Sequence, residues 1–123
     1  KIHKFTDLIV WQEGHKLVLM VYRTIQSFPV KEKFGLSNQL TRAAVSVTSN
    51  IAEGFSRQTQ KEKTQFYYMS LGSLTEVQNQ LLIAKDLRYI TQNEFDRVYE
   101  QTQYVHKLIN GLIKSSKKFI LNT

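Results

Sequence analysis

Apolar residues in this chain recur at intervals of three and four, the spacing that aligns them along one side of an α-helix. The clearest case is residues 35–57, where a polar set keeps the same period on another side. The apolar set is Leu36, Leu40, Ala43, Ala44, Val47, Ile51 and Phe55. The polar set is Arg42, Ser46, Ser49, Glu53 and Arg57. The pattern predicts a helix with one side in the core and an ordered polar side.

The same period predicts three further helices. Thr6 or Asp7 is expected to cap the first, and Thr91 with Glu94 forms the T-x-x-E capping box of the last. Residues 119–121 are expected to form an apolar tail after it. The predicted helices cover about residues 8–28, 36–55, 60–87 and 92–117. Because the connections are short, neighbouring helices must reverse direction, which predicts an all-α, antiparallel up-down-up-down four-helix bundle.

Small residues interrupt the apolar side of the third predicted helix. They are Ser70, Gly72 and Ser73. A glycine costs roughly 1 kcal/mol of helix stability relative to alanine, so its presence needs a reason. We interpret Gly72 as a point where another helix approaches closely.

Composition narrows the class of protein. The 123 residues are 41% hydrophobic and 22% charged, which is typical of one soluble globular domain. There is no cysteine, which excludes a disulfide framework, a thiol nucleophile and a cysteine-ligated zinc site. Neither a secretion signal nor an apolar run long enough to span a membrane occurs, so we expect a cytoplasmic protein without a membrane partner.

The residues provide little for catalysis. No Glu is followed three residues later by His, and His3, His15 and His106 lack the spacing of a zinc-protease helix. There is no phosphate-binding glycine loop or G-x-S-x-G nucleophile elbow. Ser46 and Ser49 have no histidine or lysine nearby to act as a base. We therefore expect a non-enzymatic protein with no cofactor and no metal.

The net charge of +7 favours an anionic partner, with nucleic acid first and an acidic protein or membrane surface second. In the predicted bundle the N-terminus, the loop between the second and third helices, and the C-terminus share one end. That end gathers eight basic and three acidic residues, a balance of +5, against +2 at the other end. Such a cluster either binds phosphates or complements helix C-termini. The predicted nucleic-acid-binding residues are Arg42, Arg57, Lys61, Lys63, Lys114, Lys117 and Lys118.

A second interpretation treats the polar side of residues 35–57 as structural. Arg42, Glu53 and the serines would satisfy one another inside the bundle or across subunits. The residues predicted for packing or a subunit interface are Ser46, Ser49, Asn50, Glu53, Gly72, Ser73 and Glu76. Of the aromatic run 66–68, most is expected in the core, although such rings also stack on bases.

Four motifs give the chain a family resemblance over almost its whole length. They are D-L-x-V-W-Q at 7–12, R-A-A-V-S at 42–46, S-N-I-A-E-G at 49–54 and G-S-L-x-E at 72–76. In combination they resemble the four-helix bundle family named for proteins encoded in intervening sequences of bacterial 23S ribosomal RNA genes. Two departures are Thr48, where the family usually has proline, and Thr41, where a second arginine is common.

The resemblance implies more than the residues alone. The family is similar in fold to the accessory protein of diversity-generating retroelements, a basic pentameric bundle that partners a reverse transcriptase and nucleic acid. By that likeness we expect a bacterial homo-oligomer, a pentamer, associated with RNA or DNA. The alternative is a structural or protein-partner module, such as a reverse-transcriptase accessory protein, without direct RNA binding. The Thr41 departure removes one positive charge from the second helix.

Overall fold

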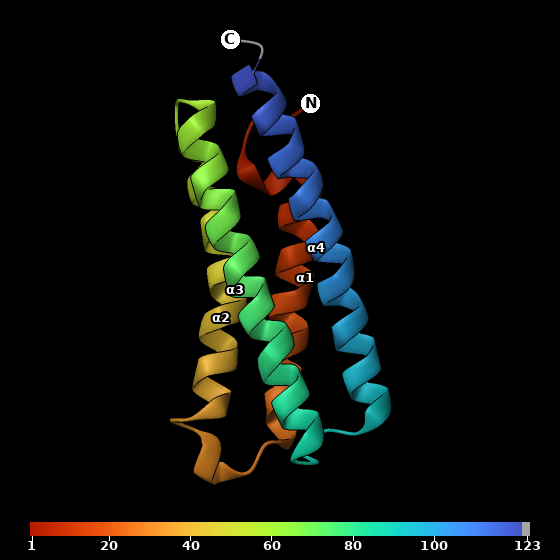
Figure 1. Cartoon of the computed structure of the whole chain (residues 1–123). Helices are drawn as coiled ribbons and strands as arrows, with labels where there is room; N and C mark the ends of the chain where they lie inside the picture. The colour runs from red at the N-terminus through yellow and green to blue at the C-terminus, as the bar shows by residue number, and fades with distance from the viewer. Residues whose placement is uncertain (122–123) are drawn as a thin grey trace.

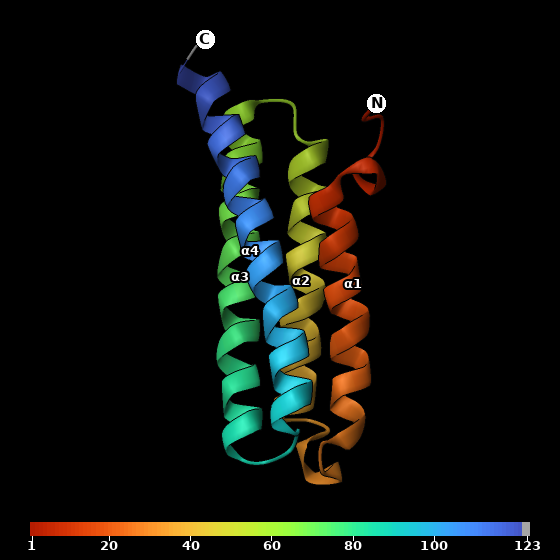
Figure 2. The ribbon, with the colours of Figure 1, turned by 90° about the vertical axis from the view of Figure 1, so that its right-hand side faces the viewer.

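A computed structural model describes residues 1–121, with side chains through Phe119. Its four long helices run alternately up and down, as predicted, and neighbours in the sequence lie side by side (Figures 1 and 2). The helices are α1 Ile9–Thr24, α2 Leu36–Ser56, α3 Gln60–Asp86 and α4 Gln92–Leu121. Three single 3₁₀ turns accompany them: η1 Phe5–Asp7, η2 Ile25–Ser27 and η3 Val30–Glu32. The predicted four-helix bundle is confirmed.

One apolar core runs along the axis of the bundle. Each helix contributes side chains that are fully buried, including Leu17, Leu40, Ile51, Leu74, Leu81 and Ile109. The apolar set that predicted α2 is buried from Leu36 to Ile51, while Phe55 is half-buried near the helix end. Burial of the regularly spaced side chains therefore explains why the four amphipathic segments assemble.

One of the two predicted helix caps is confirmed. The hydroxyl of Thr91 accepts from the Glu94 N–H at 3.1 Å, as predicted, and at the start of α3 the hydroxyl of Thr59 accepts from the Glu62 N–H at 3.1 Å. The prediction for α1 is wrong, because its N-cap is Leu8, which has no side-chain acceptor. The carboxylate of Asp7 accepts instead from the backbone N–H groups of residues 3 and 4, at 2.9 and 3.1 Å. It stabilises η1 rather than α1.

Two helix ends differ from the expected ones. The first helix stops at Thr24, where the backbone tightens into η2 before the proline. The last helix does not end near Lys117, and residues 119–121 are not a separate tail, because α4 continues to Leu121. No glycine or proline follows Lys117 to end the helix. The side chains of residues 120–121 lie outside the described residues.

The close helix contacts lie at other glycines than the predicted one. A Cβ added to Gly72 would meet nothing within 4 Å, so the expected close approach within the bundle is wrong. A Cβ on Gly54 would lie 2.6 Å from the ring of Tyr67, and one on Gly14 would lie 3.0 Å from Thr48. Gly72 is on the exposed side of α3, and a role in a subunit contact stays a prediction.

Candidate nucleic-acid interface

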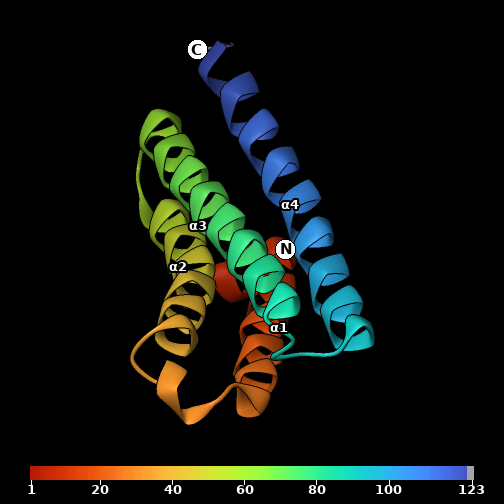
Figure 3. The same cartoon turned by 60° about the horizontal axis from the view of Figure 1, so that its bottom comes forward.

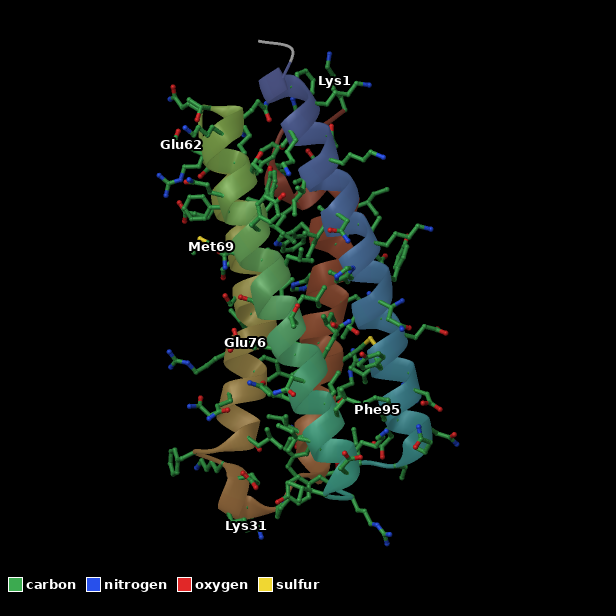
Figure 4. The ribbon with its side chains drawn as sticks, in the orientation of Figure 1. Lys1, Lys31, Glu62, Met69, Glu76 and Phe95 are labelled. Carbon is green, nitrogen blue, oxygen red and sulfur yellow. The ribbon has the colours of Figure 1, made fainter. Side chains whose placement is uncertain are left out.

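The chain termini and the α2–α3 connection meet at one end of the bundle (Figures 1 and 2). The α1–α2 and α3–α4 connections meet at the other end, which Figure 3 brings forward. In Figure 4, Lys1 and Glu62 accordingly lie far from Lys31. We call the first of these the basic end. Its exposed lysines are Lys1, Lys4, Lys61, Lys114, Lys117 and Lys118, and Arg57 and Lys63 are half-buried beside them.

Arg57 is held by contacts within the chain. Its Nη2 donates to the Glu53 carboxylate at 2.8 Å, one helical turn earlier, and its guanidinium lies 4.6 Å from the centre of the Phe66 ring. Its Nε is buried and has no hydrogen-bond partner among the described residues. The charge of Arg57 is therefore partly compensated before any ligand approaches.

Lys63 serves the end of α2. Its ammonium donates to the carbonyl oxygen of Phe55 at 2.6 Å and approaches that of Gly54 at 3.5 Å. Partial burial lowers the pKa of Lys63 below its usual value. Because the last carbonyls of a helix lack internal partners, a lysine here completes the helix terminus. This geometry favours the structural explanation for Lys63.

Three of the lysines predicted to bind nucleic acid are exposed and unpaired among the described residues. Lys61, Lys114 and Lys118 form no ion pair with any described residue, and all three side chains are exposed. Lys117 is exposed too, with its ammonium 5.4 Å from the centre of the Tyr68 ring. These four lysines come from the start of α3 and the end of α4, which lie at the same end of the bundle (Figure 1).

Arg42 lies away from the basic end. It precedes Arg57 by 15 residues in α2, which places it about 22 Å further down the helix. Arg42 instead lies between two shallow clefts. One cleft, of about 450 Å³ between α1 and α2, is lined by Tyr22, Asn38, Thr41, Arg42, Val45 and Ser49 among others. The other, of about 330 Å³ between α2 and α3, includes Gln39, Glu76 and Gln80 beside Arg42.

Some of the side chains predicted for packing or a subunit interface lie within the bundle, and others are exposed. Ser46 and Ser73 share a 2.8 Å hydrogen bond between their hydroxyls, which joins α2 to α3, and Asn50 donates to Ser46 at 3.0 Å. Ser46, Asn50 and Ser73 are thus linked by hydrogen bonds within the chain. Ser49, Glu53, Gly72 and Glu76 are exposed. Within the chain Glu53 pairs with Arg57 and not with Arg42, so the expected buried ion-pair stripe is wrong for the single chain.

The aromatic side chains of residues 66–68 are also divided between the core and the surface. Tyr67 is 3% exposed and belongs to the core, Phe66 is half-buried under Arg57, and Tyr68 is 45% exposed. Sequence reasoning missed a second aromatic group on α1, where the rings of Trp11 and His15 stack with centres 4.8 Å apart. Their spacing of four residues was the available signal, since it aligns side chains along a helix.

The described residues give little evidence of a metal site or of a membrane-spanning helix. No group of three or more histidine, aspartate or glutamate side chains among them is placed to hold a metal ion. In the same part of the chain, no helix is long and apolar enough to cross a membrane. The exposed lysines and the two clefts beside Arg42 are the features that bear on the predicted nucleic-acid binding.

A family model described as 23S rRNA-intervening sequence protein matches residues 6–111. The chain belongs to this family. The resemblance seen in the four motifs is therefore confirmed. The 23S rRNA-intervening sequence protein model spans η1 through most of α4, so the match includes the cleft between α1 and α2 and the start of α3. No curated protein matches the chain.

A solved structure shares the fold. It is a protein with unknown function from the S23 ribosomal protein family of Bacteroides thetaiotaomicron VPI-5482, at a TM-score of 0.80 and 19% identity. The superposition covers 86% of this chain and 99% of the other. At such low identity the likeness shows the fold alone, and the ligand has to be argued from the side chains.

Proposed function

We propose that this protein is a non-enzymatic RNA-binding bundle that uses its basic end to contact phosphates. The observation that supports the proposal is that exposed lysines from the start of α3 and the end of α4 lie at the same end of the bundle (Figure 1). Lys61, Lys114 and Lys118 form no ion pair with a described carboxylate, so each is able to replace a counterion of the RNA. Affinity that arises this way falls steeply with salt.

The contribution of the neighbouring cations is smaller. Lys63 is committed to the α2 terminus, and Arg57 is paired with Glu53. Helix C-termini attract cations for structural reasons as well, but Lys61 lies in the first turn of α3, where the helix dipole disfavours a cation. Its position has no such structural explanation, which supports a role in binding.

A charge-matched pair of variants tests the proposal. The first is the triple variant Lys61→Gln, Lys114→Gln and Lys118→Gln at the basic end. The control, Lys31→Gln, Lys33→Gln and Arg97→Gln, removes the same charge from exposed positions elsewhere. Fluorescence anisotropy with a labelled RNA hairpin is measured between about 50 and 200 mM salt, the range over which phosphate contacts show their salt dependence.

The two variants should behave differently despite equal net charge. We expect the basic-end variant to weaken binding and to reduce the slope of log affinity against log salt by about 2 to 3, one phosphate per lysine. The control should stay close to the unmodified protein. Binding that is absent, that ignores salt, or that falls equally in both variants contradicts the proposal.

A second candidate function is a protein-interaction module that assembles with copies of itself. The observation that favours it is the exposed side of α3, where Tyr68, Met69, Leu82 and Ile83 are 37–56% exposed. Figure 4 shows Met69 projecting away from the bundle. Exposed apolar side chains that gather on one side of a protein often mark a contact with another protein. Gly72 lies on this helix with open space above it, which suits close contact with a second subunit.

Light scattering distinguishes the second candidate. We propose a homo-oligomer, a ring of five subunits by the family likeness, and expect a molar mass several times that of the 14.4 kDa chain. Met69→Lys should reduce this mass, whereas Lys16→Glu, an exposed charge change on α1, should not. Glu53→Ala tests that side chain, since an unchanged mass would remove Glu53 from the interface. A monomeric unmodified protein would reject the ring.

A further inference from the structure

We infer that the cleft between α1 and α2 binds an unpaired nucleotide of a single-stranded RNA segment, with a phosphate at Arg42 and a base against Tyr22. The inference rests on the proposed RNA binding and adds a site that is separate from the basic end. It concerns single strands, because a base inside a duplex has both faces covered by its neighbours.

The side chains around the cleft match the parts of a nucleotide. Tyr22 is 48% exposed and Val45 39%, which leaves a flat ring and an apolar surface uncovered. Arg42 supplies a planar cation that suits phosphate oxygens. Asn38 and Ser49 line the same cleft, and their amide and hydroxyl groups suit the edge of a base or a ribose. A volume of about 450 Å³ is within the range of small-ligand pockets.

Charge selects this cleft over the one on the other side of Arg42. Among the described residues that line the α1–α2 cleft, none is acidic. The α2–α3 cleft contains Glu76, whose carboxylate would repel a phosphate. Arg42 forms no ion pair with a described residue, so no carboxylate of the chain competes with the phosphate. An anionic ligand that reaches Arg42 is therefore favoured from the α1 side.

A row of aromatic side chains on α1 leads from the cleft toward the basic end. Trp11, His15 and Tyr22 are four and seven residues apart on α1, so they share one side of the helix. The His15 ring is exposed and lies on the Trp11 ring with an angle of 15° between their planes. The Phe5 ring lies edge-on to the Trp11 ring, with the ring centres 5.4 Å apart. Lys4 is the residue immediately before Phe5.

This row places exposed rings along the path that we infer for the strand. Successive bases stack on exposed aromatic rings with little sequence preference, and a basic groove follows the backbone. A strand whose base lies on Tyr22 reaches His15 about 10 Å further up α1 and then the lysines of the basic end. The bundle thus offers unpaired bases a surface of aromatic rings on α1 and offers phosphates cations at both ends of it.

The test compares single-stranded and fully paired RNA on the full chain. The probes are a labelled 12-nucleotide oligouridylate, a labelled blunt-ended RNA duplex and free uridine monophosphate. The variants are Tyr22→Ala and Arg42→Gln. Tyr104→Ala, a tyrosine of similar exposure on α4, and Arg97→Gln serve as matched controls.

We expect Tyr22→Ala and Arg42→Gln each to weaken oligouridylate binding by about fivefold to a hundredfold, the range for loss of a stacking contact. Binding of the duplex, and oligouridylate binding by both controls, should stay within about twofold. Trp11 is the only tryptophan, so its emission reports on the row directly, and oligouridylate should quench it. Unchanged affinity in both variants, or no quenching, overturns the inference.

Further outcomes separate this inference from the proposed function. If the basic-end lysines matter and Tyr22 and Arg42 do not, the cleft is rejected and the proposed function stands. If the reverse holds, the basic end is rejected and the cleft stands. Uridine monophosphate that binds as tightly as the oligomer would identify a free nucleotide as the ligand and overturn the strand. A fall in molar mass of Tyr22→Ala would identify the face as a subunit contact and also overturn it.

Discussion

The hydroxyl of Tyr89 donates a 2.8 Å hydrogen bond to the carboxylate of Glu32, across 57 residues of sequence. The other carboxylate oxygen of Glu32 accepts from the Leu36 N–H at 3.0 Å. Glu32 thus joins the α3–α4 connection to the start of α2 at the end of the bundle shown in Figure 3. The hydroxyl of Ser27 donates to the Tyr89 carbonyl at 2.9 Å and adds a second link.

Removal of this hydroxyl should loosen the end of the bundle opposite the lysines. We expect Tyr89→Phe to lower the melting temperature by a few degrees, because Glu32 loses one partner while the ring still packs on Phe28. Tyr104→Phe is the control, since the exposed side chain of Tyr104 lies on α4 and takes no part in this link. Calorimetry at one protein concentration makes the comparison, and equal melting temperatures for the two variants would contradict the role of the link.

Acid should destabilise the bundle through two glutamates. The Leu36 N–H, and then the Tyr89 hydroxyl, hold the pKa of Glu32 below its usual 4.5. The backbone N–H of Thr91, and then its hydroxyl, do the same for the pKa of Glu94. Since both values are lowered by folding, the stabilisation is complete above the unfolded-state pKa and is lost as pH falls through the folded-state one.

Urea unfolding between about pH 6 and 3 measures the effect. We expect Glu32→Gln and Glu94→Gln to be less stable than the unmodified chain near neutral pH and to lose less of their remaining stability on acidification. Glu100→Gln, an exposed glutamate within α4, should follow the unmodified chain. Parallel pH profiles for all four proteins would show that these carboxylates do not contribute.

Two glycine-to-alanine substitutions should have opposite effects. Gly54→Ala places a methyl group 2.6 Å from the Tyr67 ring, which is 3% exposed and unable to move freely. We expect a loss of about 1–3 kcal/mol, the usual cost of overpacking. Gly72→Ala adds a methyl group in open space on α3 and should gain about 0.5–1 kcal/mol from helix propensity. Urea denaturation compares the two, and a destabilised Gly72→Ala would indicate that the site is covered by another subunit.

Neighbouring lysines of α3 should separate stability from binding. Lys63→Ala removes the donor to the Phe55 carbonyl and should cost about 1 kcal/mol, because a helix-terminal carbonyl loses its partner. Lys61→Ala should leave stability nearly unchanged and weaken hairpin binding more than Lys63→Ala does. Amide hydrogen exchange in the last turn of α2 provides a local measure. Equal exchange rates in the two variants would remove Lys63 from the helix terminus.

The elements were predictable where the signal is local. The period from Leu36 to Ile51 reflects which side of one helix is buried, and the hydroxyls of Thr59 and Thr91 reach N–H groups only three residues away. The cap of α1 was not predictable in this way. The Asp7 carboxylate could accept either from N–H groups at the start of α1 or from those of residues 3 and 4. In the structure it accepts from residues 3 and 4.

The candidate site was only partly predictable. Exposed lysines at one end followed from helix order and short connections. The sequence did not predict which of these cations remain free to bind a ligand. In the structure Lys63 donates to carbonyls of α2, and Arg57 pairs with Glu53 and lies on the Phe66 ring. The position of Tyr22 beside Arg42 also depends on how α1 lies against α2.

By itself, the sequence determined the number of helices, their order and their buried sides, because each depends on spacing and short-range capping within one segment. Its four motifs, taken together, indicated the family. Only the tertiary structure decided that Gly54 rather than Gly72 needs to lack a side chain, and that Glu32 meets Tyr89. It also decided that Arg42 faces a cleft away from the lysines. These relationships depend on the rotation and axial offset of one helix against another, which hydrophobic spacing within a single helix does not specify.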